Sequence, residues 1–212
     1  MIDLYTWHTP NGRKVSIMLE EIEMPYEVHS INIAKDEQFQ PHFLKVSPNN
    51  RIPAIVDKDN NNYSLFESGA ILLYLAEKSG KLINTDNRDD YYRTLEWLMW
   101  QMGGVGPMFG QVHHFVKYNK GKSAYSEERY SKEARRLYGV MDKRLSENQY
   151  IAGKEYSIAD ISIWPWTARF DWQEIDLNEF PNVTRWYKEM IDRPAVQKGW
   201  LVPQNDQLIP SP

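Results

Sequence analysis

Residues 48–75 read PNNRIPAIVDKDNNNYSLFESGAILLYL, and this stretch decides the fold. Residues 52–56 form a short apolar run that is typical of a buried strand, and residues 63–66 form another. The polar DNNN at residues 59–62 predicts a turn that makes the two strands antiparallel. Residues 68–78 then have the apolar spacing of a helix, which Gly80 is suited to end.

The residues before this stretch complete a small α/β domain. Residues 2–6 predict a buried strand, and Thr9-Pro10 predicts a helix start, because threonine can cap a helix and proline suits its first turn. A second strand is expected from residue 26 to about residue 32. Residues 34–47 predict a loop with a short helix whose inward-facing side chains are Phe39, Phe43 and Leu44.

The resulting order over residues 1–80 is β-α-β-α-β-β-α, which is the thioredoxin-like topology with a right-handed first crossover. Residues 81–89 are polar and predict a linker to an all-helical second domain over residues 90–203. The fold class is therefore a thioredoxin-like α/β N-terminal domain followed by an all-α C-terminal domain. Residues 204–212 are a polar tail, expected either to hang loose or to lie over the surface.

The second domain has helical periodicity throughout. Three glycines and a proline at residues 103–107 predict a kink in its first helix. Ser157 and Asp160 have the spacing of a capping box, a role in folding rather than in chemistry. The expected helices span residues 91–117, 126–145, 158–170 and 183–192.

Composition excludes several classes of function. Of the 212 residues, 42% are hydrophobic, which is enough for a sizeable core and excludes a disordered protein. The net charge is −4 and no basic block occurs, so nucleic acid is not an expected partner. No apolar run approaches the ~20 residues that span a bilayer, and the N-terminus lacks a signal-peptide pattern. We therefore expect a cytoplasmic protein that does not bind membranes.

The chain contains no cysteine. This excludes disulfides, thiolate metal sites and a protein thiol as nucleophile. Any sulfur chemistry must use sulfur that a ligand supplies.

Two dipeptides in the deciding stretch suit a peptide-like ligand. Ile52-Pro53 opens a strand, either as an ordinary edge-strand proline with no ligand or as a place where the backbone can hold part of a small peptide. Glu67-Ser68 begins a helix and suits a helix cap in any case. The free N–H groups and hydroxyl at such a helix start can also bind a carboxylate, while Glu67 binds a neighbouring ammonium.

The chain resembles the soluble glutathione transferases, and in particular their bacterial Nu class, which is related to the prion-forming nitrogen regulator of yeast. The resemblance covers essentially the whole chain. It is carried by TPNG at residues 9–12, by SPNN and IPAIVD before the first turn, and by SLFESGAILLYLAEK after it. GGVGPM, HHF, YSIADI and WPW in the second domain match as well.

This resemblance implies a set of glutathione-binding residues. Ile52, before a cis Pro53, would pair with the backbone of the cysteinyl residue, and Glu67 with Ser68 would bind the γ-glutamyl group. Gln38 and Arg51 are the candidates for the glycine carboxylate, with Lys35 a weaker one. Arg129 is the candidate cation for a second glutathione, or else a surface arginine paired with Glu133.

The resemblance also implies that the reacting species is the glutathione thiolate. An ordinary thiol has a pKa near 8.5, so only ~3% is ionised at pH 7. Tyr5, Thr9 and Asn11 are the donors near the first helix. Thr9 and Asn11 match the class, whereas Tyr5 lies inside a strand. Thr9 can act both as cap and as donor only if its lone pair takes an amide while its O–H points to sulfur.

The implied activity is glutathione-dependent disulfide-bond oxidoreduction, with weak transferase and some peroxidase activity. Reduced or oxidised glutathione would be the cosubstrate, a small disulfide or electrophile the partner, and the protein a homodimer. Two alternatives stay open: a general transferase acting on electrophiles, and a non-catalytic glutathione-binding protein. No metal is expected, because His113 and His114 are neighbours that point apart on a helix.

Overall fold

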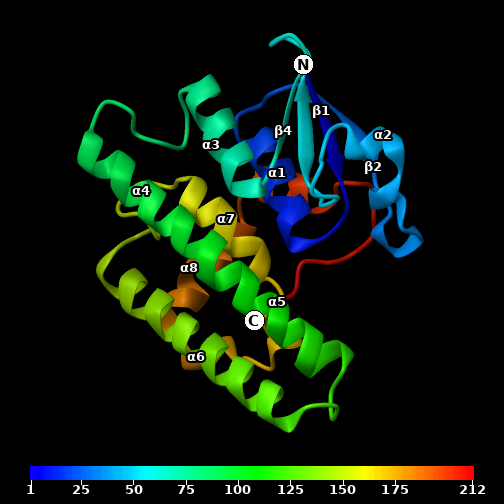
Figure 1. Ribbon diagram of the computed structural model, residues 1–212. Helices are drawn as coiled ribbons and strands as arrows, with labels where there is room; N and C mark the ends of the chain where they lie inside the picture. Colours follow the sequence, from blue (N-terminus) through cyan, green and yellow to red (C-terminus); the bar gives the residue numbers. More distant parts are fainter. The chain divides into compact units, whose positions relative to one another are not determined.

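The computed structural model describes all 212 residues, which divide by their contacts into two compact units. Unit 1 comprises residues 1–83 and 191–209, and unit 2 comprises residues 84–190 and 210–212. The division differs from the sequence-based boundaries, because residues 191–209 pack mainly with the N-terminal residues. In Figure 1 this red segment lies among the blue elements of unit 1.

Unit 1 contains one four-stranded mixed sheet. Its strands are β1 (Ile2–Thr6), β2 (Tyr26–Ser30), β3 (Ala54–Asp57) and β4 (Tyr63–Phe66), in the order β2-β1-β3-β4. β1 is parallel to β2, and the other two pairings are antiparallel, so the predicted thioredoxin-like sheet is confirmed. β3 begins two residues later than predicted, since Pro53 has no N–H for the strand ladder.

Helix α1 (Pro10–Glu21) is the most buried helix of unit 1. Every residue from Gly12 to Leu19 is buried, because α1 packs against the sheet, α3 (Ser68–Ser79) and α9 (Pro194–Trp200). Gly199 makes the α1–α9 packing possible: a Cβ there would lie 2.6 Å from the Ile17 Cα atom. Sequence analysis missed α9, although Pro194 at its first turn is a typical start signal.

The segment between β2 and β3 departs from its prediction. Of the three side chains predicted to face inward, only Phe43, in α2 (Pro41–Leu44), reaches the core, where it packs with Ile31 and Ala54. Phe39 is 50% exposed and Leu44 is 37% exposed, so the expectation that both face inward was wrong. The segment consists of short 3₁₀ turns and a single helical turn, and it is too short to present three side chains on one face.

The C-terminal segment of unit 1 lies against α1. The Trp200 indole donates to the Gln207 carbonyl over 2.8 Å, and the Arg13 guanidinium donates to the Gln207 side chain over 2.8 Å. Arg13 also lies 3.4 Å from the Trp200 ring centroid. Of the two predicted arrangements of the tail, the structure has the one that lies over the surface.

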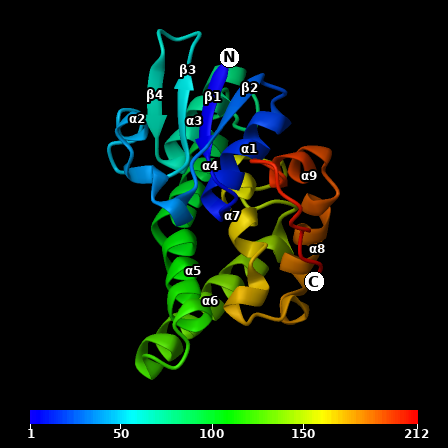
Figure 2. The ribbon, with the colours of Figure 1, turned by 90° about the vertical axis from the view of Figure 1, so that its right-hand side faces the viewer.

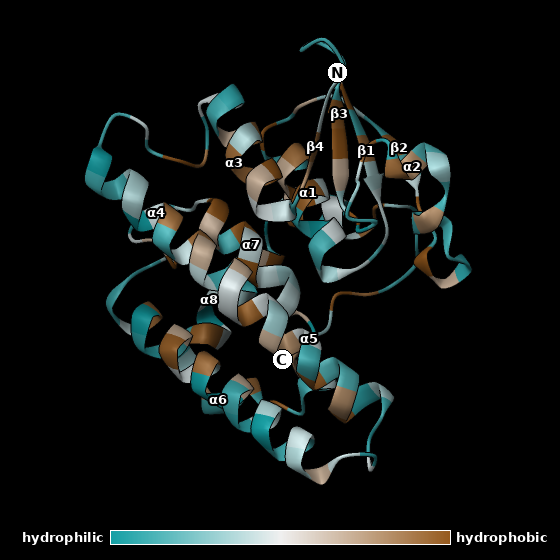
Figure 3. Ribbon diagram, viewed as in Figure 1, coloured by the Kyte–Doolittle hydropathy of each residue, from teal (hydrophilic) through white to brown (hydrophobic).

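Unit 2 is all-helical, as predicted. Its helices are α4 (Arg88–Trp100), α5 (Gly106–Val112), α6 (Ala124–Glu147), α7 (Ile158–Thr167) and α8 (Pro181–Ile191). Figure 2 shows α4 and α5 as one long green helix. Where a kink was predicted, a π-helical turn at Gln101–Val105 joins them. Figure 3 shows hydrophobic and hydrophilic residues alternating along α6, which buries Ala134, Leu137 and Met141.

The core of unit 2 surrounds α7, whose residues are all buried. The predicted capping box is confirmed: the Ser157 hydroxyl accepts from the Ala159 amide, and the Asp160 carboxylate accepts from the Ser157 amide over 3.0 Å. Asp160 also accepts from the Trp186 indole and the Ile151 amide, over 2.9 Å each. None of the helices is both long enough and apolar enough to span a membrane.

Replacing Ser157 by alanine should lower the free energy of unfolding by about 1 kcal/mol, because one cap of α7 is lost. Urea denaturation of the two proteins measures the difference. Ser146→Ala is the matched control, since its exposed hydroxyl bonds only within the last turn of α6 and its loss should change stability by less than about 0.5 kcal/mol. Equal stability of Ser157→Ala and the wild type would contradict the capping role.

Candidate functional site

Three chain segments of unit 1 meet at one edge of the sheet. The register pairs Tyr5 of β1 with Ala54, the first residue of β3, and pairs Ala54 with Phe66, the last residue of β4. β1 and β4 therefore end at the edge where β3 begins. The loop after β1, the Ile52-Pro53 dipeptide before β3 and the Glu67-Ser68 dipeptide after β4 all leave the sheet there.

Thr9 caps α1 at this edge. Its side-chain oxygen accepts from the Gly12 amide over 3.2 Å, so the hydroxyl proton must go to a different acceptor. Gly12 is required here, because a Cβ would lie 2.1 Å from the Trp7 carbonyl oxygen. Asn11 lies in the first turn of α1 and is half-buried. The cap thus has the geometry under which Thr9 can combine both predicted roles.

Tyr5 is committed to packing. Its ring stacks on His29, with centroids 4.6 Å apart, and contacts Phe43. Burial, followed by the Asp3 charge, raises the pKa of Tyr5 above its usual value. This geometry favours Thr9 and Asn11 over Tyr5 as the donors.

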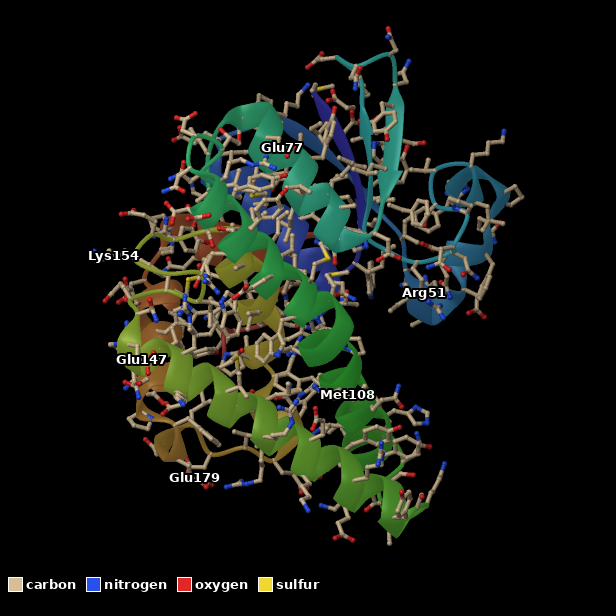
Figure 4. The ribbon with its side chains drawn as sticks, turned by 60° about the vertical axis from the view of Figure 1, so that its left-hand side comes forward. Arg51, Glu77, Met108, Glu147, Lys154 and Glu179 are labelled. Carbon is tan, nitrogen blue, oxygen red and sulfur yellow. The ribbon has the colours of Figure 1, made fainter.

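A short loop precedes β3 at this edge. The Ile52–Pro53 bond is cis, as the family resemblance implies, and Pro53 is buried. The Ser47 hydroxyl donates to the Arg51 carbonyl over 2.8 Å and holds the loop in place. The Arg51 side chain is exposed, and it lies at the tip of this loop in Figure 4.

Gln38 is a buried amide in a 3₁₀ turn (Glu37–Phe39) between β2 and α2. It is 7% exposed, and its Oε1 atom has no hydrogen-bond partner within the protein. Leaving a buried polar atom unsatisfied costs about 1–3 kcal/mol, so Gln38 suits a ligand contact better than a purely structural role. Lys35, by contrast, is exposed.

Glu67 and Ser68 begin α3 in an unusual backbone conformation. Glu67 has φ 72° and ψ 112°, and its side chain makes no capping hydrogen bond. A non-glycine residue in such a region costs on the order of 1–3 kcal/mol, and such residues cluster at binding sites. The Glu67 side chain is exposed, whereas Ser68 is only 4% exposed. The start of α3 therefore brings a carboxylate, a buried hydroxyl and the first amides of the helix side by side.

Sequence analysis missed Lys14, which lies beneath this helix start. Lys14 is 1% exposed, and its Nζ donates to the Ser68 Oγ atom over 3.2 Å. Burial lowers the pKa of Lys14 to about 7, while the charge of Glu67 opposes this lowering. The signal was present in the sequence, because Lys14 is four residues from Met18 and so shares the buried stripe of α1.

Arg129, in α6, belongs to unit 2. It lines a cavity of about 620 Å³ together with Met108 and Lys132. Both carboxylate oxygens of Glu133 accept hydrogen bonds from Arg136, over 2.7 and 2.8 Å. The hydrogen bond from Arg136 is the main cause that lowers the pKa of Glu133, and the charge of Arg129 lowers it further, so Arg129 interacts with Glu133 through its charge.

Two groups of possible metal ligands have other partners. His113 is buried beside Trp166 and bonds Gln173 over 3.2 Å, and burial followed by the charge of Arg169 lowers its pKa to about 4. In unit 1, Asp3, Glu27 and His29 bring donor atoms within 4.8 Å of one another. There the Lys58 ammonium lies 2.6 Å from Asp3 and 3.3 Å from Glu27 and offsets part of their charge.

Comparison with protein families matches both units. Residues 1–77 match the glutathione S-transferase N-terminal domain, and residues 105–194 match the C-terminal domain. The chain belongs to the glutathione S-transferase family. The family predicted from the sequence is thus confirmed. The chain is also 47% identical over 208 residues to the disulfide-bond oxidoreductase YfcG of Escherichia coli, covering 96% of each protein.

Solved structures of transferases are similar as well. A glutathione transferase family member from Pseudomonas fluorescens with two glutathione bound has a TM-score of 0.91 and 47% identity, covering 95% of this chain and 93% of that one. A glutathione transferase from Pseudomonas putida with one glutathione disulfide per subunit has a TM-score of 0.89 and 46% identity, with coverage of 95% and 91%.

The strain at Glu67 makes a prediction about stability. Glycine has no Cβ and adopts positive φ readily, so Glu67→Gly should not lower the free energy of unfolding and should raise it by up to about 1 kcal/mol. Glu77→Gly is the control within α3: it lies exposed in the helix (Figure 4) and should lower stability by about 1 kcal/mol. Chemical denaturation of both variants measures this. A loss at Glu67 as large as that at Glu77 would show that the backbone there is not strained.

Proposed function

We propose that this transferase is a cytoplasmic, homodimeric, glutathione-dependent disulfide-bond oxidoreductase. One observation carries the proposal: a single sheet edge gathers Thr9 and Asn11, the cis Ile52–Pro53 dipeptide and the Glu67-Ser68 dipeptide in a chain without cysteine. These are the parts needed to hold a thiol peptide and to ionise its sulfur. The relatives support it, since YfcG is named a disulfide-bond oxidoreductase and the similar structures hold glutathione or its disulfide.

Each part of glutathione has a proposed partner. The γ-glutamyl carboxylate binds the Ser68 hydroxyl and the amides at the start of α3, and its ammonium binds Glu67. The cysteinyl backbone pairs with Ile52, before Pro53. The glycine carboxylate accepts from the N–H groups of the buried Gln38 side chain and from Arg51 at the rim.

Thr9 and Asn11 are proposed to ionise the thiol. Lowering its pKa by two units requires ~2.7 kcal/mol of preference for the anion. Hydrogen bonds to charged acceptors contribute ~1.5–3 kcal/mol each, so one or two donors suffice. The Thr9 oxygen already accepts a hydrogen bond from the Gly12 amide, so the Thr9 hydroxyl can donate its own hydrogen bond to the sulfur.

The chemistry is thiol–disulfide exchange in two steps. The bound thiolate attacks one sulfur of the substrate disulfide, forming a glutathione mixed disulfide and releasing the other half as a thiolate, which takes up a proton. The thiolate of a second glutathione then attacks the glutathione sulfur, giving oxidised glutathione and the second substrate thiol. Two glutathiones are oxidised for each disulfide reduced. Arg129 is the proposed cation for a carboxylate of the second glutathione.

Removing both hydrogen-bond donors to the glutathione sulfur should slow disulfide reduction. In Thr9→Ala/Asn11→Ala, kcat/KM for reduction of 2-hydroxyethyl disulfide by glutathione should fall about 10- to 100-fold, since one or two charge-assisted hydrogen bonds are lost. Coupling to glutathione reductase and NADPH measures the rate. Ultraviolet absorbance of the bound thiolate should fall in parallel.

Two controls separate activation from capping. Thr9→Ser keeps both hydroxyl and cap and should retain most of the activity. Asn87→Ala removes the side-chain cap of α4 without touching the site and should leave kcat/KM unchanged. Wild-type rates in the double variant would refute the assignment of Thr9 and Asn11.

The alternative, conjugation of electrophiles, uses the same thiolate and therefore the same residues. Rates with a small disulfide and with an aromatic halide, measured side by side at equal glutathione, discriminate the two. We expect the disulfide to be the better substrate. Faster turnover of the halide would favour a general transferase, and tight glutathione binding without either turnover would favour a non-catalytic binding protein.

A further inference from the structure

The most unusual polar contact of unit 1 joins two buried side chains on different helices. Lys14 is 1% exposed and Ser68 is 4% exposed, and their Nζ and Oγ atoms are 3.2 Å apart. Lysine is almost never fully buried without a paired charge. Glu67, at the start of α3, is an acidic group whose charge favours the buried ammonium.

An ammonium and a neutral amine impose opposite directions on this hydrogen bond. An ammonium has three donors and no acceptor, so the Ser68 oxygen must accept and the serine proton must go elsewhere. A neutral amine can instead accept the serine proton. The charge state of Lys14 therefore decides whether the Ser68 hydroxyl can donate to a third group.

We propose that Lys14 is a positioning residue of the glutathione site: its ammonium directs the Ser68 hydroxyl toward the γ-glutamyl carboxylate, so that binding is coupled to uptake of a proton by Lys14. This inference rests on the proposed function, in which Glu67 and Ser68 bind the γ-glutamyl group. Lys14 does not touch the ligand, because it is buried beneath Ser68. It acts through the hydroxyl and through its charge.

The charges around Lys14 are consistent with such a coupling. Glu67, at the start of α3, is the acidic group whose charge favours the ammonium, while burial disfavours it and brings the pKa of Lys14 to about 7. Elsewhere on α1, Arg13 is directed to Trp200 and Gln207. Arg193, just before α9, pairs with Glu21, and Asp3 of β1 pairs with Lys58. Lys198, the charged residue of α9, is exposed. A carboxylate arriving at Ser68 adds a second negative charge and shifts Lys14 toward the ammonium.

Calorimetry with S-methylglutathione tests the coupling. This ligand has no thiol proton, so the release of a proton from sulfur cannot mask uptake by the protein. Titrations in buffers of different ionisation enthalpy at about pH 8 should show roughly 0.4–0.8 proton taken up per ligand, if the carboxylate raises the pKa of Lys14 by one to two units. In Lys14→Met this uptake should be lost, and the affinity should fall about tenfold.

Two comparisons make the test specific. The ligand's ammonium faces Glu67 in both proteins, so its own contribution cancels in the difference between wild type and Lys14→Met. An S-methyl ligand that lacks the γ-glutamyl α-carboxylate should cause no Lys14-dependent uptake. Lys14→Arg keeps a cation that does not titrate near neutral pH, and it should bind S-methylglutathione without the uptake.

The outcomes separate this inference from the function on which it rests. If the wild type binds S-methylglutathione but takes up no more protons than Lys14→Met, the role of Lys14 is refuted while the glutathione site stands. If the wild type does not bind S-methylglutathione at all, the proposed function fails. If Lys14→Met does not fold, the wild type alone decides the matter: its proton uptake is compared on binding S-methylglutathione and on binding the ligand that lacks the α-carboxylate. Equal proton uptake with the two ligands overturns the inference.

Discussion

The burial of α1 is the constraint on which the rest of unit 1 depends. Eight consecutive residues of this helix are buried, and two of them, Arg13 and Lys14, are cationic. Buried cations must be hydrogen-bonded or paired. Because neighbouring residues point to different sides of a helix, the two cations bind different partners. Arg13 binds the C-terminal segment through Trp200 and Gln207, and Lys14 binds the start of α3.

This arrangement explains why the C-terminal residues belong to the N-terminal unit. The segment after residue 190 supplies α9, whose Gly199 lets its backbone touch Ile17, and it supplies acceptors for Arg13. The same helix starts at Thr9, where the side-chain oxygen caps it and the hydroxyl proton is directed elsewhere. The residues of α1 that pack against α9 and the residues near its proposed ligand site thus belong to one helix. The sheet register brings the start of this helix to the edge where β3 begins and β4 ends.

Local signals predicted most of the fold. The turn before Tyr63, the cap at Ser157 and the stop at Gly80 depend on residues close in sequence, and each is found in the structure. Phe43 was correctly predicted to face inward, whereas Phe39 and Leu44 were mispredicted because short 3₁₀ turns have no amphipathic period. Helix α9 was missed because its stability depends on contacts with α1 that no local pattern records. Site residues at helix and strand starts were accessible to sequence reasoning, whereas Lys14 has a role only through its tertiary contact with Ser68.

The central claim is that one sheet edge holds glutathione with its sulfur facing the start of α1. A crystal structure of the protein with oxidised glutathione tests this most directly. The account predicts the γ-glutamyl carboxylate on Ser68 and the first amides of α3, with a sulfur atom within hydrogen-bond distance of the Thr9 hydroxyl and the Asn11 side chain. A bound ligand whose sulfur faces Tyr5, or whose γ-glutamyl group lies away from Ser68, would contradict it.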